Sequence, residues 1–281
     1  MTKVTLVGIT HIDAESPVKV KRIIEELKPD AVCLELDEFR LNQLLEQSQV
    51  LQHEYTDHAQ PSQLTLSDEL PTSIQETLHF EVDFLEDLPT ILEDIGFFEG
   101  ELAKIANVDF PGLEMLLAYQ TAKKLGSNIY LIDKSIHDIS QAMALEISEE
   151  ESLKFQELID ELILDKKIVV KKTSDSNETA DEHLKEEEML KLNDEEINLT
   201  DVFTLFQNQD SLKSILEIFR SHFPNLYSIL LEDRDVYMTK EILKVALNHS
   251  NIVVVIGYGH IKAISELLQQ HAKGLEIVIS K

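Results

Sequence analysis

Short apolar runs alternate with longer amphipathic segments over much of the chain. Several runs have the length and the Val, Ile and Leu content of buried strands, and stretches with apolar residues at helical spacing follow them. The chain opens with strand, helix, strand and helix, which predicts an α/β fold with a mainly parallel central sheet flanked by helices. The expected strands are Val4–Val7, Ala31–Leu36, Asn128–Asp133, Asn251–Gly257 and Glu276–Ser280.

The amphipathic segments should form the helices around this sheet. The first has Ser16 as its expected N-cap and Pro17 as its first residue. Gly126 is expected to close a later one. The helical patterns cover residues 16–29, 38–52, 73–80, 88–106, 112–126, 136–144, 210–223, 232–250 and 260–274.

Residues 147–200 differ from the rest because they are very acidic and mostly helical in pattern. The stretch "KKTSDSNETADEHLKEEE" within them has almost no apolar residues, which is typical of a mobile tip or a solvated helix. We therefore expect a single α/β domain over residues 1–281 with an acidic helical insertion at 147–200, which would act as a lid or an arm.

The charge of the chain narrows its possible partners. There are 25 Lys and Arg residues against 53 Asp and Glu, which gives a net charge of −28. A field of this sign repels nucleic acid and anionic lipid and attracts cations and basic peptides, although a gain in solubility alone would also account for it.

The composition also sets the expected location. No apolar run reaches the roughly 18 residues of a membrane helix, and one cysteine, Cys33, excludes a disulfide within the chain. We expect a cytoplasmic protein with no transmembrane segment in this chain, associated with a membrane at most through a partner.

Four expected strands carry an ionisable residue at or near their carboxyl end. These residues are His11, Glu35, Asp133 and His260. In a parallel sheet all four would line one rim, where ligands of α/β proteins bind. Imidazoles and carboxylates together are common ligands of first-row divalent metals. Each histidine is the last residue of a Gly-x-x-His step. The glycine of this step would let the backbone turn sharply and leave room beside a ligand.

Glu35 is the most informative of the four because it lies between Leu34 and Leu36 in a buried run. A buried carboxylate is costly unless it is paired or binds a cation. The alternatives are that Glu35 faces solvent on an edge strand, or that it pairs with an arginine such as Arg234. For the two histidines, the alternative is an ordinary strand-end residue that bonds to backbone.

Three further charged residues are candidates on helices. Arg234 and Asp235 lie at an expected helix start, where Arg234 could bind a substrate carboxylate or clamp a catalytic glutamate. Glu114 lies in the first turn of another helix, where an acid also suits the helix dipole. A plain surface charge cluster is the alternative for the first pair.

Four stretches together resemble the TraB/PrgY family. They are "VGITHIDAESPVKVKRIIEELKPDAVCLELDEFR", "PGLEMLLAYQTAKKLGSNIYLID", "EDRDVYMTKEI" and "VVVIGYGHIKAI". The family is grouped with the TIKI and GumN proteins and, more remotely, with erythromycin esterases and ChaN-like proteins. The resemblance implies an α/β core and metal-dependent hydrolysis, with His11 and His260 as metal ligands and Glu35 as the family glutamate. Glu114, Asp133, Arg234 and Asp235 fall on the other motif positions.

The chain departs from the family pattern at two places. Asp233 precedes Arg234 where the family usually has Glu, and Lys134-Ser135 follows the middle strand where Arg-Asp is common. Many family members also have a C-terminal membrane region, whereas this sequence ends at Lys281 without one, which argues against a membrane role or indicates a soluble form.

These observations lead to a metal-dependent peptidase as the first hypothesis. His11, His260, Glu35 and Asp133 would be the metal ligands for Mn²⁺, Co²⁺ or Zn²⁺, and Glu35, Glu114, Arg234 and Asp235 the catalytic residues. The metal would activate a water, a glutamate would move its proton, and Arg234 would stabilise the oxyanion or position the base.

The substrate would be a peptide, as implied for PrgY-like members, which are linked to disabling peptide pheromones. The alternatives are a protein that sequesters a peptide or small ligand without cleaving it, and a metal-dependent esterase. A homodimer formed through the insertion is also expected.

Overall fold

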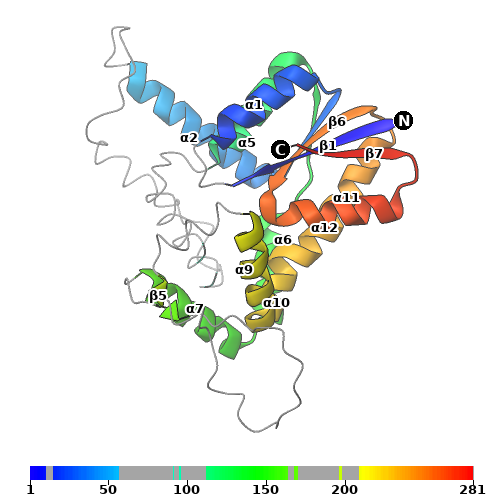
Figure 1. The fold of residues 1–281 in the computed structure, drawn as a ribbon. Helices are drawn as coiled ribbons and strands as arrows, with labels where there is room; N and C mark the ends of the chain where they lie inside the picture. The colour runs from blue at the N-terminus through cyan, green and yellow to red at the C-terminus, as the bar shows by residue number, and fades with distance from the viewer. Residues whose placement is uncertain are drawn as a thin grey trace.

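The computed structural model describes residues 1–10, 15–56, 91, 95, 112–163, 168–169, 196–197 and 209–280. At its centre lies a five-stranded sheet with the order β3-β2-β6-β1-β7, in which all pairings are parallel (Figure 1). The expected α/β fold is confirmed. The strands are β1 (Thr2–Ile9), β2 (Ala31–Leu34), β3 (Asn128–Leu131), β6 (Asn251–Gly257) and β7 (Leu275–Ser280).

Helices cover both faces of the sheet (Figure 1). On one face, α1 (Ser16–Leu27) and α5 (Leu113–Leu125) pack together with the first part of α2 (Glu38–Thr56). On the other face lie α11 (Asp233–Ala246) and α12 (Tyr258–His271). Helix α1 begins at Ser16 with Glu15 in the N-cap position, one residue earlier than expected.

The central strand β6 is apolar because both of its faces are covered. Ile252, Val254 and Ile256 pack in the core beneath α11 and α12, whereas Val253 and Val255 pack beneath α1 and α5. All five side chains are fully buried. A parallel strand between two helix layers has this continuous apolar sequence rather than an alternating one.

A third group of helices packs beside the sheet and around its own apolar cluster. Its residues include Met143, Phe155, Phe223 and Leu226, all of which are buried. The helices of this group are α6 (Ile136–Glu146), α7 (Glu149–Ile163), α9 (Gln209–His222) and α10 (Pro224–Tyr227), with the π-helix η2 (Ser228–Glu232) leading into α11.

The expected acidic insertion starts with α7, which packs against the other helices of this group. Glu151 on α7 accepts hydrogen bonds from the Leu226 backbone N–H at 2.9 Å and from the Asn225 side chain at 2.8 Å. Further along, β4 (Ile168–Val169) pairs antiparallel with β5 (Glu196–Ile197). The stretch 171–188 and the helices expected at 73–80 and over most of 88–106 lie outside the described residues, and the division into domain and insertion stays a prediction.

The topology has a switch point at the carboxyl ends of three adjacent strands, where their connections leave the sheet on opposite faces. β6 lies between β1 and β2. β1 and β2 lead into α1 and α2 on one face, whereas β6 leads into α12 on the opposite face. In open α/β sheets, ligands bind where the connections of neighbouring strands go to opposite faces in this way.

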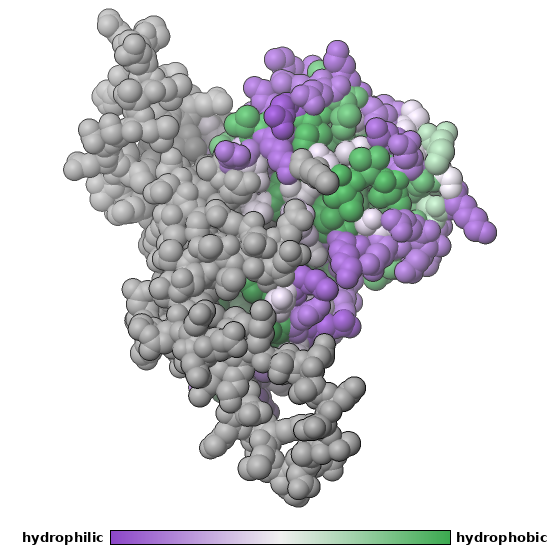
Figure 2. All heavy atoms as spheres, in the orientation of Figure 1, coloured by the Kyte–Doolittle hydropathy of each residue, from purple (hydrophilic) through white to green (hydrophobic). Residues whose placement is uncertain are grey.

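On the face shown in Figure 2, the coloured surface is hydrophilic over much of the helices, and an apolar area lies near the edge of the sheet. β7 forms that edge, and its Ile279 is 45% exposed. None of the described helices has both the length and the apolar character that a membrane crossing needs.

Candidate functional site

The structure brings five of the candidate residues to this switch point. Glu35 follows β2 directly, and Asp133 comes two residues after β3. Arg234 and Asp235 lie in the first turn of α11, and His260 lies in the first turn of α12. They come from four separate segments of the chain, since only Arg234 and Asp235 are neighbours, so their meeting depends on the order of the strands.

Two other candidates, His11 and Glu114, are not among these five residues. His11 lies outside the described residues, although β1 leads toward the same rim, since Ile9 pairs with Gly257. Glu114 is only 2% exposed in the first turn of α5. Its catalytic role stays a prediction.

Glu35 is held by donors from three directions. The Gly257 N–H donates to Oε2 at 2.5 Å, Arg234 Nη2 donates to Oε1, and His260 Nε2 lies 3.2 Å from Oε1. Burial alone would raise the pKa of Glu35, but the positive charges of His260 and Arg234 hold that pKa well below its ordinary value. The sequence alternative in which Glu35 pairs with Arg234 is therefore what the structure contains.

Glycines make room at this rim in two different ways. A Cβ atom on Gly257 would lie 3.3 Å from Glu35 Oε2, so a larger residue would press on the carboxylate that its own N–H holds. Gly8 lies inside β1 rather than at a turn, and a Cβ there would lie 2.7 Å from the ring of Tyr258. The expectation of a turn glycine therefore holds for the second Gly-x-x-His step and is wrong for the first.

Arg234 connects two carboxylates. Its Nε and Nη2 donate to Asp133 at 3.0 Å and 2.7 Å, its Nη2 also donates to Glu35, and its Nη1 donates to the Leu230 carbonyl at 2.9 Å. Leu230 belongs to the π-helix η2, so this carbonyl comes from the turn just before α11. Burial opposes the charge of Arg234, but Asp133 and Glu35 raise its pKa above the ordinary value.

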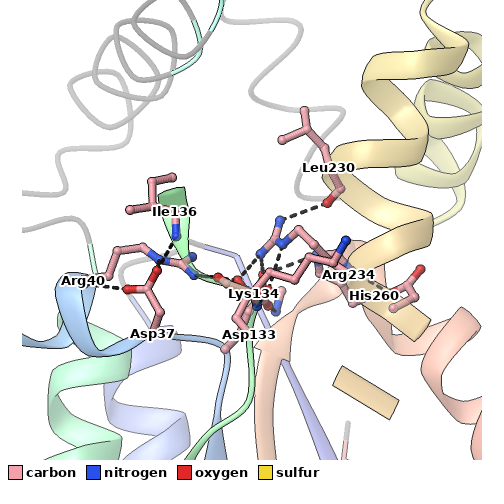
Figure 3. Close-up of polar contacts among 11 residues, drawn as sticks. Asp37, Arg40, Asp133, Lys134, Ile136, Leu230, Arg234 and His260 are labelled. Atoms are coloured by element: carbon pink, nitrogen blue, oxygen red, sulfur yellow. Dashed lines mark hydrogen bonds and ion pairs between the residues drawn. The ribbon is translucent and has the colours of Figure 1, made fainter. Parts of the chain in front are cut away.

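Asp133 is fully enclosed by donors. Besides Arg234, it accepts from Arg40 Nη2 at 2.8 Å and from the Lys134 N–H at 2.8 Å (Figure 3). Burial would raise the pKa of Asp133, but Arg234 and Arg40 lower it. This is the setting of an anchoring carboxylate, in contrast to the metal ligand expected from the sequence, and its ligand role stays untested.

His260 is placed between two carboxylates. Its Nδ1 lies 2.7 Å from Asp235 Oδ1, and its Nε2 faces Glu35. Burial disfavours the imidazolium, but Glu35 and the hydrogen bond to Asp235 raise the pKa of His260 to about 9. Burial raises the pKa of Asp235, against the effect of the same hydrogen bond.

Sequence reasoning missed two residues that extend these contacts. Arg40, in the first turn of α2, also donates from Nη2 to the Lys134 carbonyl at 2.9 Å, and its Nε lies 3.4 Å from Asp37 Oδ2. Asp37 accepts the backbone N–H groups of Arg40 at 2.7 Å and Ile136 at 2.5 Å, which fixes the starts of α2 and α6 (Figure 3). The sequence feature that could have identified Asp37 and Arg40 is their acid–base spacing in "ELDEFR", but this spacing is also common on exposed helices.

The contacts form one continuous series in which acidic and basic side chains alternate. We call this series the ion-pair network. Its seven residues, in order, are Asp37, Arg40, Asp133, Arg234, Glu35, His260 and Asp235.

Two residues at one end of the network, His260 and Glu35, are of types that bind metal ions in proteins. Because Asp235 binds Nδ1 of His260, the other ring nitrogen is the one available to a metal, an arrangement common among metal-bound histidines. Glu35 lies beside that nitrogen. Across the described parts of the chain, no group of three or more His, Cys, Asp or Glu side chains could hold a metal. A complete ligand set would therefore need a residue such as His11.

Comparison with known proteins places this site in a wider context. The sequence pattern of the TraB/PrgY/gumN family matches residues 1–277. An uncharacterised protein of Methanocaldococcus jannaschii is 24% identical over 274 residues, which are 97% of this chain and 55% of that relative. The chain thus spans about half the length of this curated relative. Since the family match extends over almost the whole chain, the protein belongs to the TraB/PrgY/gumN family.

Proposed function

We propose that the protein is a metal-dependent hydrolase that cleaves a peptide bond at the Glu35–His260 end of the ion-pair network. The observation that supports this most is the position of His260, whose two ring nitrogens each face a carboxylate at the switch point of the sheet. A titratable histidine between carboxylates is a frequent feature of catalytic sites.

His260 would hold the metal together with His11, and Glu35 would lie beside it as the general base. A divalent cation such as Mn²⁺, Co²⁺ or Zn²⁺ would supply Lewis acidity toward a water and a substrate carbonyl. To accept a metal, His260 Nε2 must give up the proton that it shares with Glu35. Asp235 would keep the ring in one orientation during this exchange, because it binds the opposite nitrogen.

Glu35 is the residue that would move a proton. A carboxylate can accept hydrogen bonds at about four positions, and three of those on Glu35 are taken by Gly257, Arg234 and His260. The remaining position would take the proton of the attacking water and pass it to the leaving amine.

Arg234 fits a positioning role better than an oxyanion role. A guanidinium has five N–H bonds, and four hydrogen bonds from Arg234 go to Asp133, Glu35 and Leu230. At most one N–H remains for a substrate oxygen. Arg234 would therefore mainly fix the orientation of Glu35.

The experiment that tests this proposal measures cleavage. Purified protein, loaded in turn with Mn²⁺, Co²⁺ and Zn²⁺, is incubated with mixed peptide and ester substrates, and products are identified by mass spectrometry. We expect peptide cleavage that a chelator removes and that His260→Ala abolishes. The control is His271→Ala, which changes an exposed histidine on the same helix.

Other outcomes select the other hypotheses. Cleavage of esters without peptides would replace the peptidase by an esterase. Tight peptide binding without cleavage under every metal would contradict a hydrolase and favour a protein that sequesters its ligand.

A further inference from the structure

We infer that Arg40 is a positioning residue for the proposed catalytic site, acting on Glu35 through Asp133 and Arg234. This inference rests on the proposed function for its catalytic consequence. Its structural part, that Arg40 controls the orientation of Arg234, can be tested without any activity.

The connection passes through shared atoms. Arg40 Nη2 donates to Asp133 Oδ2 at 2.8 Å, and Arg234 Nη2 donates to the same oxygen at 2.7 Å. The nitrogen Nη2 of Arg234 is also the one that binds Glu35. One oxygen and one nitrogen therefore link Arg40 to the carboxylate that would move the proton.

Burial makes this connection strong. The side chain of Asp133 is fully buried, and those of Arg234 and Glu35 are 12% and 7% exposed, whereas that of Arg40 is 24% exposed. Charges inside a protein are screened less than those in water. Arg40, which lies nearer the surface, therefore interacts strongly with the buried Asp133 and, through Asp133, with Arg234.

The balance of charge gives the direction of the effect. Asp133 is shared by two cations, and Glu35 and Asp133 compete for Arg234. Without Arg40, Asp133 would have Arg234 as its remaining cationic partner in the network. Arg234 would then move toward Asp133 and away from Glu35, which would leave the catalytic carboxylate less well oriented.

Arg40 is itself held firmly in place. Its Nη2 bridges Asp133 and the Lys134 carbonyl, and its backbone N–H is bound by Asp37. Asp37 also accepts a hydrogen bond from the Ile136 N–H. Its carboxylate therefore joins the start of α2, which contains Arg40, to the start of α6. A lysine has a single charged nitrogen and would not reproduce the planar contacts of a guanidinium.

The test uses the arginine side chains as probes. The chain has four arginines, Arg22, Arg40, Arg220 and Arg234, so ¹⁵N-arginine labelling of the full protein gives few side-chain signals. Loss of one signal in Arg234→Lys assigns the Nε–H of Arg234. The spectra then compare wild type with Arg40→Gln and Arg40→Lys, and with Arg220→Gln as control. Arg220 forms an ion pair with Glu232 at 2.9 Å but is 64% exposed.

We expect the Arg234 signal to shift and to exchange faster with solvent in Arg40→Gln, less so in Arg40→Lys, and to stay unchanged in Arg220→Gln. An Arg234 signal that is unchanged in a folded Arg40→Gln protein would overturn the inference. If Arg40→Gln does not fold, Arg40→Lys supplies the same comparison.

A kinetic measurement tests the catalytic part once a cleaved peptide is known. Arg40→Gln should lower kcat by about 10- to 100-fold with KM changed less than about twofold, as is typical for residues behind the reacting groups. An equal loss in Arg220→Gln, or a change confined to KM, would contradict a positioning role. If wild type cleaves nothing, the proposed function fails while the Arg234 spectra still decide the coupling.

Discussion

Glu35 keeps its charge in a buried place because each of its oxygens has a donor. The Gly257 N–H, the Arg234 guanidinium and His260 supply these donors. Hydrogen bonds and positive charges together offset the cost of removing a carboxylate from water. The negative charge of Glu35 is thus stabilised by its buried partners rather than by water.

Glu35→Gln tests this directly. The amide keeps the size of the side chain but leaves Arg234 with a neutral partner, so we expect a loss of about 1–3 kcal/mol in the free energy of unfolding. Urea unfolding measures it, with the exposed Glu276→Gln as control. Equal stability of the two variants would mean that the buried ion pair contributes little.

Gly257→Ala tests the space beside Glu35. The backbone angles of Gly257, φ −56° and ψ 143°, are open to alanine, so the main effect is the new methyl group 3.3 Å from Glu35 Oε2. We expect hydrolysis to fall at least about tenfold, in line with disturbed residues behind a reacting group. Gly259→Ala is the matched control, since its methyl would meet Leu231 at an ordinary 3.5 Å. Equal activity of the two variants would count against the crowding.

The sequence could name Glu35, Arg234, Asp235 and His260 as candidates, because each is an ionisable residue beside an apolar run or at a helix start. It could not choose between a metal and an arginine as the partner of Glu35. Arg40 was missed because its acid–base spacing with Asp37 is also normal on an exposed helix. The role of Arg40 depends on its contact with Asp133, which lies 93 positions further along the chain.

At the level of elements, the strands were predicted well because apolar β-branched runs leave few alternatives. The exceptions are β2, which ends at Leu34 and not at Leu36, and β3, which ends at Leu131 and not at Asp133. The Glu35 N–H still bonds to the Val255 carbonyl, but the Leu36 N–H turns back to Leu34 at 2.8 Å. The position of β6 between β1 and β2 could not be predicted, because it depends on pairing between distant segments.

Asp30 joins β2 to β6 at the amino ends of these strands, opposite the switch point. Its carboxylate accepts from the Ser250 N–H and hydroxyl and from the Asn251 N–H, each at 3.0 Å. Burial alone would raise the pKa of Asp30, but these bonds lower it. The folded protein therefore binds the proton less tightly than the unfolded chain does.

The pH dependence follows from this direction. The stabilisation is present above the unfolded pKa of about 4 and is lost as the pH falls through the lower folded value. Asp30→Asn should cost roughly 1–2 kcal/mol in the free energy of unfolding at pH 7, and the difference from wild type should narrow below about pH 4. Urea unfolding at both pH values measures this, with the exposed Asp160→Asn as control. A difference that does not change with pH would contradict the assignment.

At the level of the whole molecule, the net charge of −28 favours cationic ligands. A basic peptide should bind more weakly as salt rises, because screening shortens the range of the field. Fluorescence anisotropy in low and high salt measures the Kd, and an acidic peptide of equal length is the control. Binding that does not depend on salt would show that the charge serves another purpose. The homodimer and the cytoplasmic location stay predictions.

The central claim is that His260 and Glu35 belong to a metal-dependent catalytic site, and the metal content of the protein tests it most directly. Protein purified without chelator, then reloaded with Mn²⁺, Co²⁺ or Zn²⁺ and desalted, is analysed by mass spectrometry. The account predicts about one equivalent of metal in wild type and in His271→Ala, and a loss in His11→Ala and His260→Ala. Retention of the metal in the folded His260→Ala protein, or its absence from wild type with every cation, would contradict the account.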